Sequence, residues 1–390
     1  MRSRTMPSSA KMLRIGLVLD DSLDSPDGVQ QYVLAIGEWL RSQGHEVIYL
    51  AGETSRTDIK GLYSLSRNIR VKSNGNYLTI PLPTSKSKLR AFLNQQKLDI
   101  LHVQTPYSPF MGGQLVKVAA DTTAVIGTFH ILPNSRSISF GTHLLGLLSQ
   151  RSLKRFDKML SVSPVAAVFA KQSFGVSSTV LPNVIDYARF KKAKPLAKYD
   201  DGKLTVLFLG RLVPRKGCLL LLQAIDLLLK NNSELPDFRV VICGKGQLQA
   251  SLEQFVDKAG LSKIVEFTGY VSEEDKPAYY ASADISVFPS SGGESFGIVL
   301  LEAMANGRSA VLAGDNAGYR SVMDGQPDLL FNPKSVAQLA QKLQEYLVNA
   351  PERQQMAAWG SKYTENFDVN IVGEKLLSIY REALHKRNKL

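Results

Sequence analysis

The sequence has few cysteines and no long apolar run. Only Cys218 and Cys243 occur among its 390 residues, and both lie in apolar stretches that predict reduced core residues rather than a disulfide framework. No segment approaches the roughly 20 consecutive apolar residues that a membrane-spanning helix needs. These absences argue against a disulfide-stapled secreted domain and against a protein built from membrane-spanning helices.

We also expect neither a metal site nor a signal peptide from the sequence. No cluster of His, Cys, Asp or Glu has metal-ligand spacing, and no two aspartates are spaced as D-x-D. We therefore expect no metal ion and no other cofactor. Residues 1–11 are polar and basic, with no apolar segment ahead of the first expected strand, which predicts a disordered start rather than a signal peptide. A cytoplasmic protein follows from this interpretation.

The chain has the composition of a globular protein, with 44% hydrophobic and 21% charged residues. Its length favours two domains. Its net charge of +12 is uneven: residues 1–183 carry 21 Lys and Arg against 11 Asp and Glu, whereas residues 184–390 carry 26 against 24. The excess favours an anionic partner for the first half, such as a membrane lipid or a phosphorylated substrate, and a merely basic surface is the alternative. Nucleic acid is not expected, because no zinc spacing, aromatic RNA-binding motif or arginine-rich arm is present.

Short apolar strands alternate with helical patterns along the whole chain. The expected strands are 13–19, 44–50, 98–103, 124–130, 158–163 and 178–183 in the first half, and 204–210, 238–244, 265–269, 285–289 and 309–313 in the second. This alternation predicts two doubly wound, Rossmann-like α/β domains that face each other across a cleft, with ligands at the carboxyl ends of the strands. A basic, proline-containing stretch separates the halves, so we place the domains at 12–185 and 186–367. A final helix, 368–390, would cross back to the first domain.

The run GGESFGIVLLEAM, residues 292–304, places Glu294 and Glu302 around an apolar segment. Ser295 is the predicted N-cap of a buried helix that continues through Met304. An acid in so apolar a segment is costly to bury unless something hydrogen-bonds it, and ligand hydroxyls could be that partner. This segment is therefore the first candidate for a ligand site.

Three loops after expected strands could meet an anion. Gly28 precedes a helix, whose N-terminus favours negative charge, and the loop 210–217 places three cations before another helix. Cations are disfavoured by the helix dipole at the N-terminus of a helix, so we expect a bound pyrophosphate to be the partner of these three side chains. The third loop, Gly244-Lys245-Gly246, resembles half a dinucleotide fingerprint. Ordinary loops remain the alternative for the first and third. His130 ends an expected strand and is equally compatible with a structural role and a ligand contact.

The order and spacing of these pieces resemble the retaining GT-B glycosyltransferases of family 4, and among them the bacterial phosphatidylinositol mannosyltransferases. The resemblance covers residues 13–384. It is most specific from Val206 to Met304, where LFLGRLVPRKG, ICGKG, FTGYVSEEDK and FPSSGGESFGIVLLEAMA follow one another. It implies a hexosyltransferase that uses a nucleotide-sugar donor, retains the anomeric configuration and needs no metal.

The resemblance also implies roles for the matching residues. Glu294 would hold hydroxyls of the donor sugar and Glu302 the ribose, while Arg211 and Lys216 would neutralise the departing diphosphate. Gly28 would bring backbone N–H near that phosphate, and His130 would contact the sugar from the opposite domain. The same donor site would include Gly244, Gly246, Val271, Glu273, Lys276, Ser295, Phe296, Gly297 and Ile298. Glu294 is not expected to be a covalent nucleophile, unlike the paired carboxylates of retaining hydrolases.

The motifs define the donor and the acceptor less closely than they define the family. In the mannosyltransferases the stretch corresponding to Val271–Lys276 flanks guanine, and Glu273 or Glu274 could accept its two adjacent N–H groups, which favours GDP-mannose. A UDP-sugar is the alternative, with a different glycolipid, a polysaccharide or a soluble molecule as acceptor.

The inositol-binding relatives have an aromatic residue where this chain has Asp20-Asp21. Their strand-end histidine is followed by Thr, whereas Ile131 follows His130 here. Their His-Glu-Pro-Asn segment corresponds here to HVQTPY, from His102 to Tyr107. Gln30 still matches. Asp21, Gln30 and Tyr107 are therefore the acceptor-binding candidates, and a membrane lipid is the favoured acceptor.

Two basic stretches, residues 86–93 and 144–160, could be amphipathic helices at a membrane surface. A core-facing helix with a solvated basic side is an equal alternative for each. The charge excess of the first half favours membrane contact, and with it a peripheral position on the inner face of the cell membrane. The oligomeric state is not indicated by the sequence.

Overall fold

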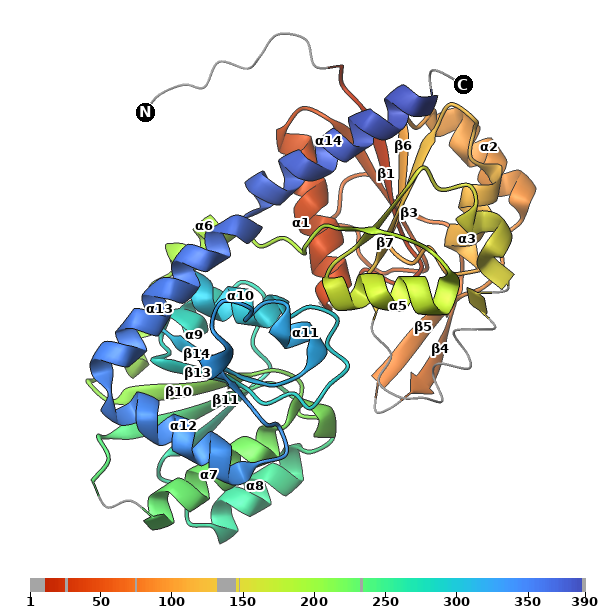
Figure 1. Ribbon diagram of the computed structural model, residues 1–390. Coiled ribbons are helices and arrows are strands. Elements are labelled where there is room, and N and C mark those ends of the chain that lie inside the picture. The colour runs from red at the N-terminus through yellow and green to blue at the C-terminus, as the bar shows by residue number, and fades with distance from the viewer. Residues whose placement is uncertain are drawn as a thin grey trace.

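The computed structural model describes residues 11–24, 27–73, 76–131, 145–146, 148–231 and 234–387. The described chain forms two parallel sheets, each covered by helices on both faces, and its last helix returns from the second half to the first (Figure 1). The predicted fold of two doubly wound α/β domains with a returning C-terminal helix is confirmed. The expected start at residues 1–10 lies outside the described residues.

The first sheet has seven strands in the order β3-β2-β1-β6-β7-β8-β9, all paired in parallel. The strands are β1 (Arg14–Leu19), β2 (Glu46–Ala51), β3 (Leu62–Ser64), β6 (Ile100–Val103), β7 (Ala124–Phe129), β8 (Lys158–Ser161) and β9 (Thr179–Val180). Its helices are α1 (Gly28–Ser42), α2 (Lys86–Gln96), α3 (Met111–Val118) and α5 (Pro164–Phe174). The central strands β1, β6 and β7 read as nearly continuous apolar runs because both of their faces are buried, whereas the edge strands β3 and β9 are largely exposed.

Each face of this sheet has its own core. Leu17 packs in one core with apolar residues of α1 and of the C-terminal helix, and Val18, on the opposite face, packs with residues of α2 and α3. Within α2, Leu89 and Leu93 are buried, which favours the core-facing alternative for the basic stretch 86–93. Part of the second basic stretch, 144–160, lies outside the described residues.

A two-stranded antiparallel hairpin, β4 (Asn68–Ser73) with β5 (Asn76–Pro81), was not expected. It follows β3 and precedes α2, and it projects from the first half of the molecule in Figure 1. Its strands, NIRVKS and NYLTIP, mix polar and apolar residues and so lack the continuous apolar run that marks the strands of the parallel sheets.

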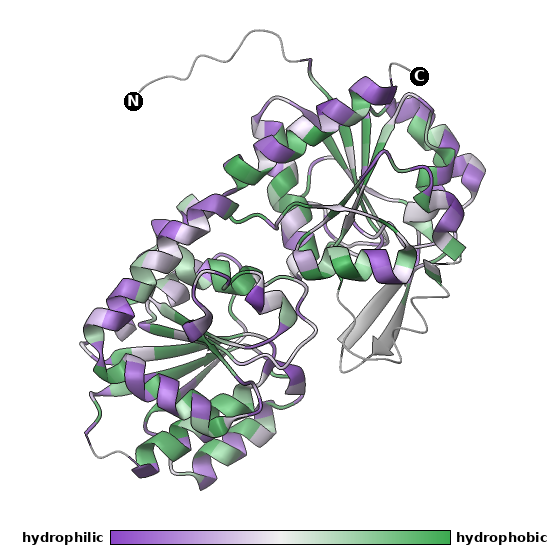
Figure 2. Cartoon of the chain, viewed as in Figure 1, coloured by the Kyte–Doolittle hydropathy of each residue, from purple (hydrophilic) through white to green (hydrophobic). Residues whose placement is uncertain are grey.

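The second sheet has six parallel strands in the order β12-β11-β10-β13-β14-β15. They are β10 (Leu204–Leu209), β11 (Phe238–Cys243), β12 (Val265–Gly269), β13 (Ile285–Phe288), β14 (Ala310–Gly314) and β15 (Leu330–Phe331). The helices around it are α7 (Cys218–Asn231), α8 (Gln249–Lys258), α9 (Lys276–Ala281), α10 (Ile298–Ala305), α11 (Ala317–Arg320), α12 (Val336–Val348) and α13 (Ala350–Thr364). Both cysteines are buried and unpaired, as predicted. Figure 2 shows hydrophobic residues concentrated in the strands and hydrophilic ones on the outer faces of the helices.

Two segments connect the halves side by side. The outgoing one precedes α6 (Tyr187–Lys191), and the returning one joins the turn Glu365–Phe367 to α14 (Val369–Arg387). Ile185 donates its N–H to the carbonyl of Phe367 at 3.0 Å and accepts from Val369 at 2.9 Å. The α14 helix then packs on α1, where the indole N–H of Trp39 donates to Asn370 at 3.0 Å. None of the described helices has the length and apolar character to cross a membrane.

Candidate active site

Several candidate residues of the second domain, among them Arg211, Lys216 and Glu294, lie in the loops that follow β10 and β13. These two strands are neighbours in the sheet, so their carboxyl ends lie together. After β10 the chain makes a short 3₁₀ turn, Pro214–Lys216, and Gly217 takes a positive φ of 73° before α7 begins. A Cβ on Gly217 would lie 2.2 Å from the carbonyl oxygen of Pro289, so only glycine allows the two loops to pack this closely.

Glu294, in the β13–α10 loop, is the centre of a compact charged cluster. Its Oε1 is 2.9 Å from Nζ of Lys216 and 2.6 Å from Nη1 of Arg215. The hydroxyl of Ser290 donates to the same oxygen at 2.8 Å. The structure thus brings Glu294 and Lys216 together and adds Arg215 and Ser290, which were not among the predicted site residues.

Burial and charge act in opposite directions on this cluster. Desolvation alone would raise the pKa of Glu294, but the positive charges of Lys216 and Arg215 outweigh it and lower the pKa to about 2. Desolvation lowers the pKa of Lys216, and Glu294 counteracts that shift. The site therefore holds a carboxylate that stays ionised at neutral pH, with two cations on one of its oxygens.

Glu302 lies in α10 and belongs to a second cluster. Its carboxylate accepts a hydrogen bond from the hydroxyl of Tyr280 at 3.2 Å, and burial raises its pKa while nearby Lys276 opposes the rise. Lys276 also pairs with Glu273 at 2.6 Å. Arg189 donates to the backbone carbonyl of Glu273. The structure therefore assembles Glu273, Lys276 and Glu302, which the resemblance assigned to the nucleoside end of the donor.

The start of α10 differs from the sequence expectation. The prediction that Ser295 is the N-cap is wrong, because the helix begins at Ile298 and Gly297 occupies the cap position with a φ of 154°. The backbone carbonyl of Ser295 instead accepts a hydrogen bond of 2.5 Å from the hydroxyl of Ser163, at the start of α5 in the first domain. Tertiary contacts, rather than a local cap, fix this loop. Phe296 is buried in the core of the second domain.

The N-terminus of α1 faces the same loops from the first domain. A Cβ on Gly28 would lie 3.9 Å from Cγ2 of Ile298. Arg211 has Nη1 3.8 Å from Oδ1 of Asp27. Asp27 occupies the N-cap position of α1 without a side-chain capping hydrogen bond. An anion between Arg211 and α1 would meet both a guanidinium group and a helix N-terminus.

His130 directly follows β7 and is buried. Its Nε2 lies 2.8 Å from Oε1 of Gln104, which follows β6, and its ring makes an edge contact with Tyr32 of α1 at 5.1 Å. Desolvation lowers the pKa of His130 to about 3, so the ring is neutral at physiological pH. His102 of β6 is buried nearby, hydrogen-bonded to Tyr380 and to Thr128 at 2.7 Å each.

The acceptor candidates fall into two places. Asp21 and Gln30 lie together, since the Gln30 amide donates to Asp21 Oδ2 at 3.3 Å. Tyr107 instead packs against Phe129 and Phe174, with ring centroids 5.8 and 5.3 Å away, in a cluster of three aromatic rings. Its hydroxyl oxygen is buried and has no hydrogen-bond partner among the described residues.

Gly244 and Gly246 have a packing explanation. A Cβ on Gly244 would lie 2.0 Å from the carbonyl oxygen of Gly210, and one on Gly246 would lie 2.3 Å from that of Leu212. The loop after β11 is held this closely against the loop after β10.

Val271, the remaining donor candidate, is buried in the core of the second domain. No group of three or more potential ligands in the described residues could hold a metal ion.

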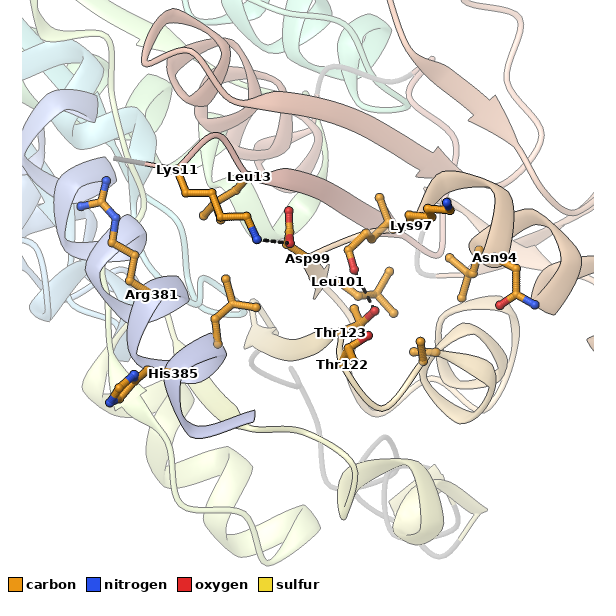
Figure 3. Close-up of a pocket in the computed structure, with 15 residues that line it drawn as sticks. Lys11, Leu13, Asn94, Lys97, Asp99, Leu101, Thr122, Thr123, Arg381 and His385 are labelled. Atoms are coloured by element: carbon orange, nitrogen blue, oxygen red, sulfur yellow. Dashed lines mark hydrogen bonds and ion pairs between the residues drawn. The ribbon is translucent and has the colours of Figure 1, made fainter. Parts of the chain in front are cut away.

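A cavity of about 790 Å³ lies elsewhere, at the amino-terminal edge of the first sheet (Figure 3). It is lined in part by Leu13, Asp99 and Thr123, which directly precede β1, β6 and β7. Lys11 reaches into it and pairs with Asp99 at 3.7 Å. Lys97 follows the last turn of α2, where a cation complements the helix dipole. This cavity is at the opposite edge of the sheet from the candidate site.

Comparison with known proteins agrees with this geometry. The family model described as Glycosyltransferase Family 4 matches residues 26–189, and the one described as Glycosyl transferases group 1 matches residues 189–363. The phosphatidyl-myo-inositol mannosyltransferase of Mycolicibacterium smegmatis is 31% identical over 94% of this chain and 93% of its own length. A Mycobacterium tuberculosis protein named GDP-mannose-dependent alpha-(1-6)-phosphatidylinositol monomannoside mannosyltransferase is 26% identical, covering 95% of this chain and 98% of its own.

The fold also matches solved structures. Anabaena HepE in complex with UDP and glucose superposes with a TM-score of 0.75 at 17% identity, over 95% of this chain and all of that one. Fold and site together define a glycosyltransferase of the GT-B class. More particularly, the match to the Glycosyltransferase Family 4 model and the 31% identity to the Mycolicibacterium smegmatis protein over nearly the whole chain show that the chain belongs to glycosyltransferase family 4. The resemblance drawn from the motifs is thereby confirmed, and the roles of individual residues stay predictions.

Proposed function

We propose that this glycosyltransferase transfers mannose from GDP-mannose to a phosphatidylinositol-type lipid, with retention of the anomeric configuration, at the inner face of the cell membrane. The names of its relatives, which include phosphatidyl-myo-inositol mannosyltransferases and a GDP-mannose-dependent enzyme, support the proposed donor and acceptor. The uneven basic charge of residues 1–183 supports contact with an anionic lipid surface.

The observation that carries the proposal is the cluster of Glu294, Lys216 and Arg215 opposite the N-terminus of α1. Breaking a glycosyl–phosphate bond develops negative charge on the leaving diphosphate. Two buried or half-buried cations and a helix N-terminus, fixed before the reaction, stabilise that charge without reorganisation. Arg211, at the edge of the same space, would add a third cation.

Glu294 suits a binding role better than a nucleophilic one. Lys216, Arg215 and Ser290 all contact Oε1, so Oε2 is the oxygen that can accept sugar hydroxyls. A carboxylate whose charge is shared by two cations is also a weakened nucleophile. We therefore propose front-face attack by the acceptor hydroxyl, with the departing phosphate taking its proton.

The second cluster supports a nucleoside site at the other end of the donor. Glu302 would accept ribose hydroxyls, which removes the cost of its burial. The ion pair between Lys276 and Glu273 fixes the loop beside it. Glu273 or Glu274 would then accept the two adjacent N–H groups of guanine, which uracil does not offer.

The acceptor would bind in the first domain beside the α1 N-terminus. The amide of Gln30 donates to the carboxylate of Asp21 there, and amide and carboxylate groups are of the kind that hydrogen-bond a polyol headgroup. The aromatic cluster around Tyr107 contributes packing rather than a second polar contact.

Binding of nucleotides tests the donor assignment first. Thermal unfolding is followed with GDP, UDP and ADP, and with GDP-mannose and UDP-glucose, since a selective ligand raises the apparent stability. We expect stabilisation by GDP and GDP-mannose, and its loss in Glu302→Gln. Selective stabilisation by UDP and UDP-glucose would overturn the GDP-mannose proposal and favour a UDP-sugar-dependent enzyme.

A further inference from the structure

Glu294 lies in a loop, residues 290–297, whose backbone conformation depends on glycine. Gly293, directly before Glu294, has a φ of 71°, and Gly297, three residues after it, has a φ of 154°. Glycine adopts such angles without steric cost, so local preferences alone do not determine where Glu294 is placed. The position of this loop therefore depends on the contacts that other segments make with it.

The second domain contacts the loop through α11 and through its core. The side-chain amide of Asn316 donates to the carbonyl of Ser290 at 3.0 Å. A Cβ on Gly318 would lie 2.0 Å from the carbonyl oxygen of Glu294, so α11 packs directly on the backbone there. Phe296 is buried in the core. These contacts hold the loop in its own domain.

The first domain contacts the same loop through the start of α5 (Figure 1). Ser163 follows β8 and is 1% exposed. Its hydroxyl accepts a hydrogen bond from the backbone N–H of Ala166 at 3.1 Å and donates one to the carbonyl of Ser295 at 2.5 Å. Val162 and Ala166 also pack in the same apolar cluster as Phe296. One buried hydroxyl thus caps α5 and joins the two domains.

A second polar contact between the domains is longer and more exposed. Arg211 lies 3.8 Å from Asp27, and their side chains are 41% and 51% exposed. An ion pair between exposed side chains contributes little to holding two segments together. The hydrogen bond of Ser163 is short and largely shielded from water, so it is the stronger constraint on the position of α5 against the loop.

We propose that Ser163 is a positioning residue whose hydrogen bond to Ser295 fixes the first domain against the loop of Glu294, and so aligns the acceptor hydroxyl with the anomeric carbon of the donor sugar. This inference rests on the proposed function, because it takes the acceptor to bind in the first domain and the sugar to bind beside Glu294. Ser163 acts through the position of the domains and touches neither substrate. Alignment of two reactants lowers the barrier to transfer, and a displacement of about 1 Å can cost about a hundredfold in rate.

Two substitutions separate the hydrogen bond to Ser295 from the capping of α5. Glycine is nearly as good an N-cap as serine, whereas alanine is a poor one. Ser163→Gly therefore removes chiefly the bond between the domains, and Ser163→Ala removes both the bond and the cap. Ser335→Ala is the matched control, because Ser335 caps α12 by accepting from the N–H of Gln338 at 3.2 Å. The α12 helix packs on α7 within the second domain.

The kinetic test uses vesicles that contain phosphatidylinositol as the acceptor. We expect kcat for mannose transfer to fall at least roughly fivefold in both Ser163→Gly and Ser163→Ala. The Kd of GDP-mannose should change by less than about twofold, because Lys216, Glu294 and Glu302 keep their places in the second domain. Ser335→Ala should change neither quantity by more than about twofold. A loss of kcat in Ser163→Ala but not in Ser163→Gly would assign Ser163 a capping role and overturn the proposal.

The arrangement of the domains can be measured without any substrate. Spin labels are placed on Lys171→Cys in α5 and Lys258→Cys in α8, which are exposed positions in the two domains, while both native cysteines are buried. Pulsed dipolar spectroscopy should show a broader distribution of distances between the labels in Ser163→Gly than in the wild type or in Ser335→Ala.

Identical distance distributions in Ser163→Gly and in the wild type would overturn the proposal. A broader distribution in Ser163→Gly, combined with no mannose transfer by the wild type, would contradict the proposed donor or acceptor. That result would still support the role of Ser163 in joining the domains, so failure of the proposed function is distinguishable from failure of this inference.

Discussion

Replacing Lys216 with methionine removes one cation from the Glu294 cluster while keeping the length of the side chain. The Nζ to Oε1 distance of 2.9 Å corresponds to a Coulombic attraction of about 6 kcal/mol at an effective dielectric constant of about 20. Arg215, at 2.6 Å from the same oxygen, exerts a similar attraction and stays in place. Glu294 should therefore remain ionised at neutral pH in the variant.

Loss of activity in Lys216→Met would then report the missing cation beside the diphosphate, not a protonated Glu294. Removing one preorganised group that stabilises transition-state charge typically costs about 10²- to 10³-fold in kcat, or about 3 to 4 kcal/mol. We expect a loss of this size from pH 6 to pH 9, measured as release of nucleoside diphosphate from the donor. The control is Lys230→Met, an exposed lysine of α7 whose loss should leave kcat unchanged.

Two outcomes would refute this reasoning. Full activity in Lys216→Met would show that the lysine does not act on the leaving group. A loss that disappears as the pH rises would show that the pKa of Glu294 has moved into the assay range, so that Arg215 does not hold the carboxylate ionised.

Four further substitutions test other parts of the site. Asp27→Asn removes the carboxylate that approaches Arg211, so the Kd for GDP measured by calorimetry should fall about two- to fivefold, and weaker binding would contradict this account. Glu302→Gln should raise the KM for the donor by roughly tenfold or more with little change in kcat, because the charge-assisted hydrogen bond from the ribose that it weakens is worth about 1.5–3 kcal/mol. An unchanged KM would show that Glu302 does not belong to the donor site. Gly246→Ala should lower the free energy of unfolding in urea by about 1–3 kcal/mol, because its Cβ would lie 2.3 Å from a backbone oxygen, and a neutral effect would contradict the packing explanation. Burial raises the pKa of Asp20 to about 6, so ionisation of this carboxyl destabilises the fold as the pH rises through that value. Asp20→Asn should therefore stabilise the protein at pH 8, and this gain in stability should vanish by pH 4. A gain that does not depend on pH would refute the assignment.

The architecture was predictable because a parallel sheet buried on both faces leaves a simple pattern in the sequence. Strands such as Leu204–Leu209 and Phe238–Cys243 are continuous apolar runs, and their loops carry the polar residues that reach the ligand side. The hairpin of Asn68–Ser73 with Asn76–Pro81 lacks such runs. The Asn-Gly dipeptide between its strands is the signal that could have identified it.

The residues of the candidate site could be predicted from the sequence, but the ion pairs between them could not. Charge and helix-dipole arguments point to the loop of Arg211 and Lys216, yet only the fold decides that Arg215 and Lys216 contact Glu294 while Arg211 approaches Asp27. Ser295 has the local chemistry of an N-cap and still fails to cap α10. The contact of its carbonyl with Ser163, 132 residues away, outweighs the local preference.

The orientation of His130 shows the same limit. Its place after a strand suggests a position near the ligand, but Gln104, the residue that hydrogen-bonds its ring, follows a different strand, 26 residues earlier. No local pattern connects the two positions, because hydrogen bonds between parallel strands and their loops depend on the order of the strands in the sheet.

The decisive measurement is the transfer of radiolabelled mannose from GDP-mannose to vesicles that contain phosphatidylinositol. We expect label in the lipid fraction with the wild-type protein, an α-linked product, and a loss of at least about a hundredfold in Lys216→Met. Absence of lipid-bound label, together with transfer from a UDP-sugar or to a soluble acceptor, would contradict this expectation.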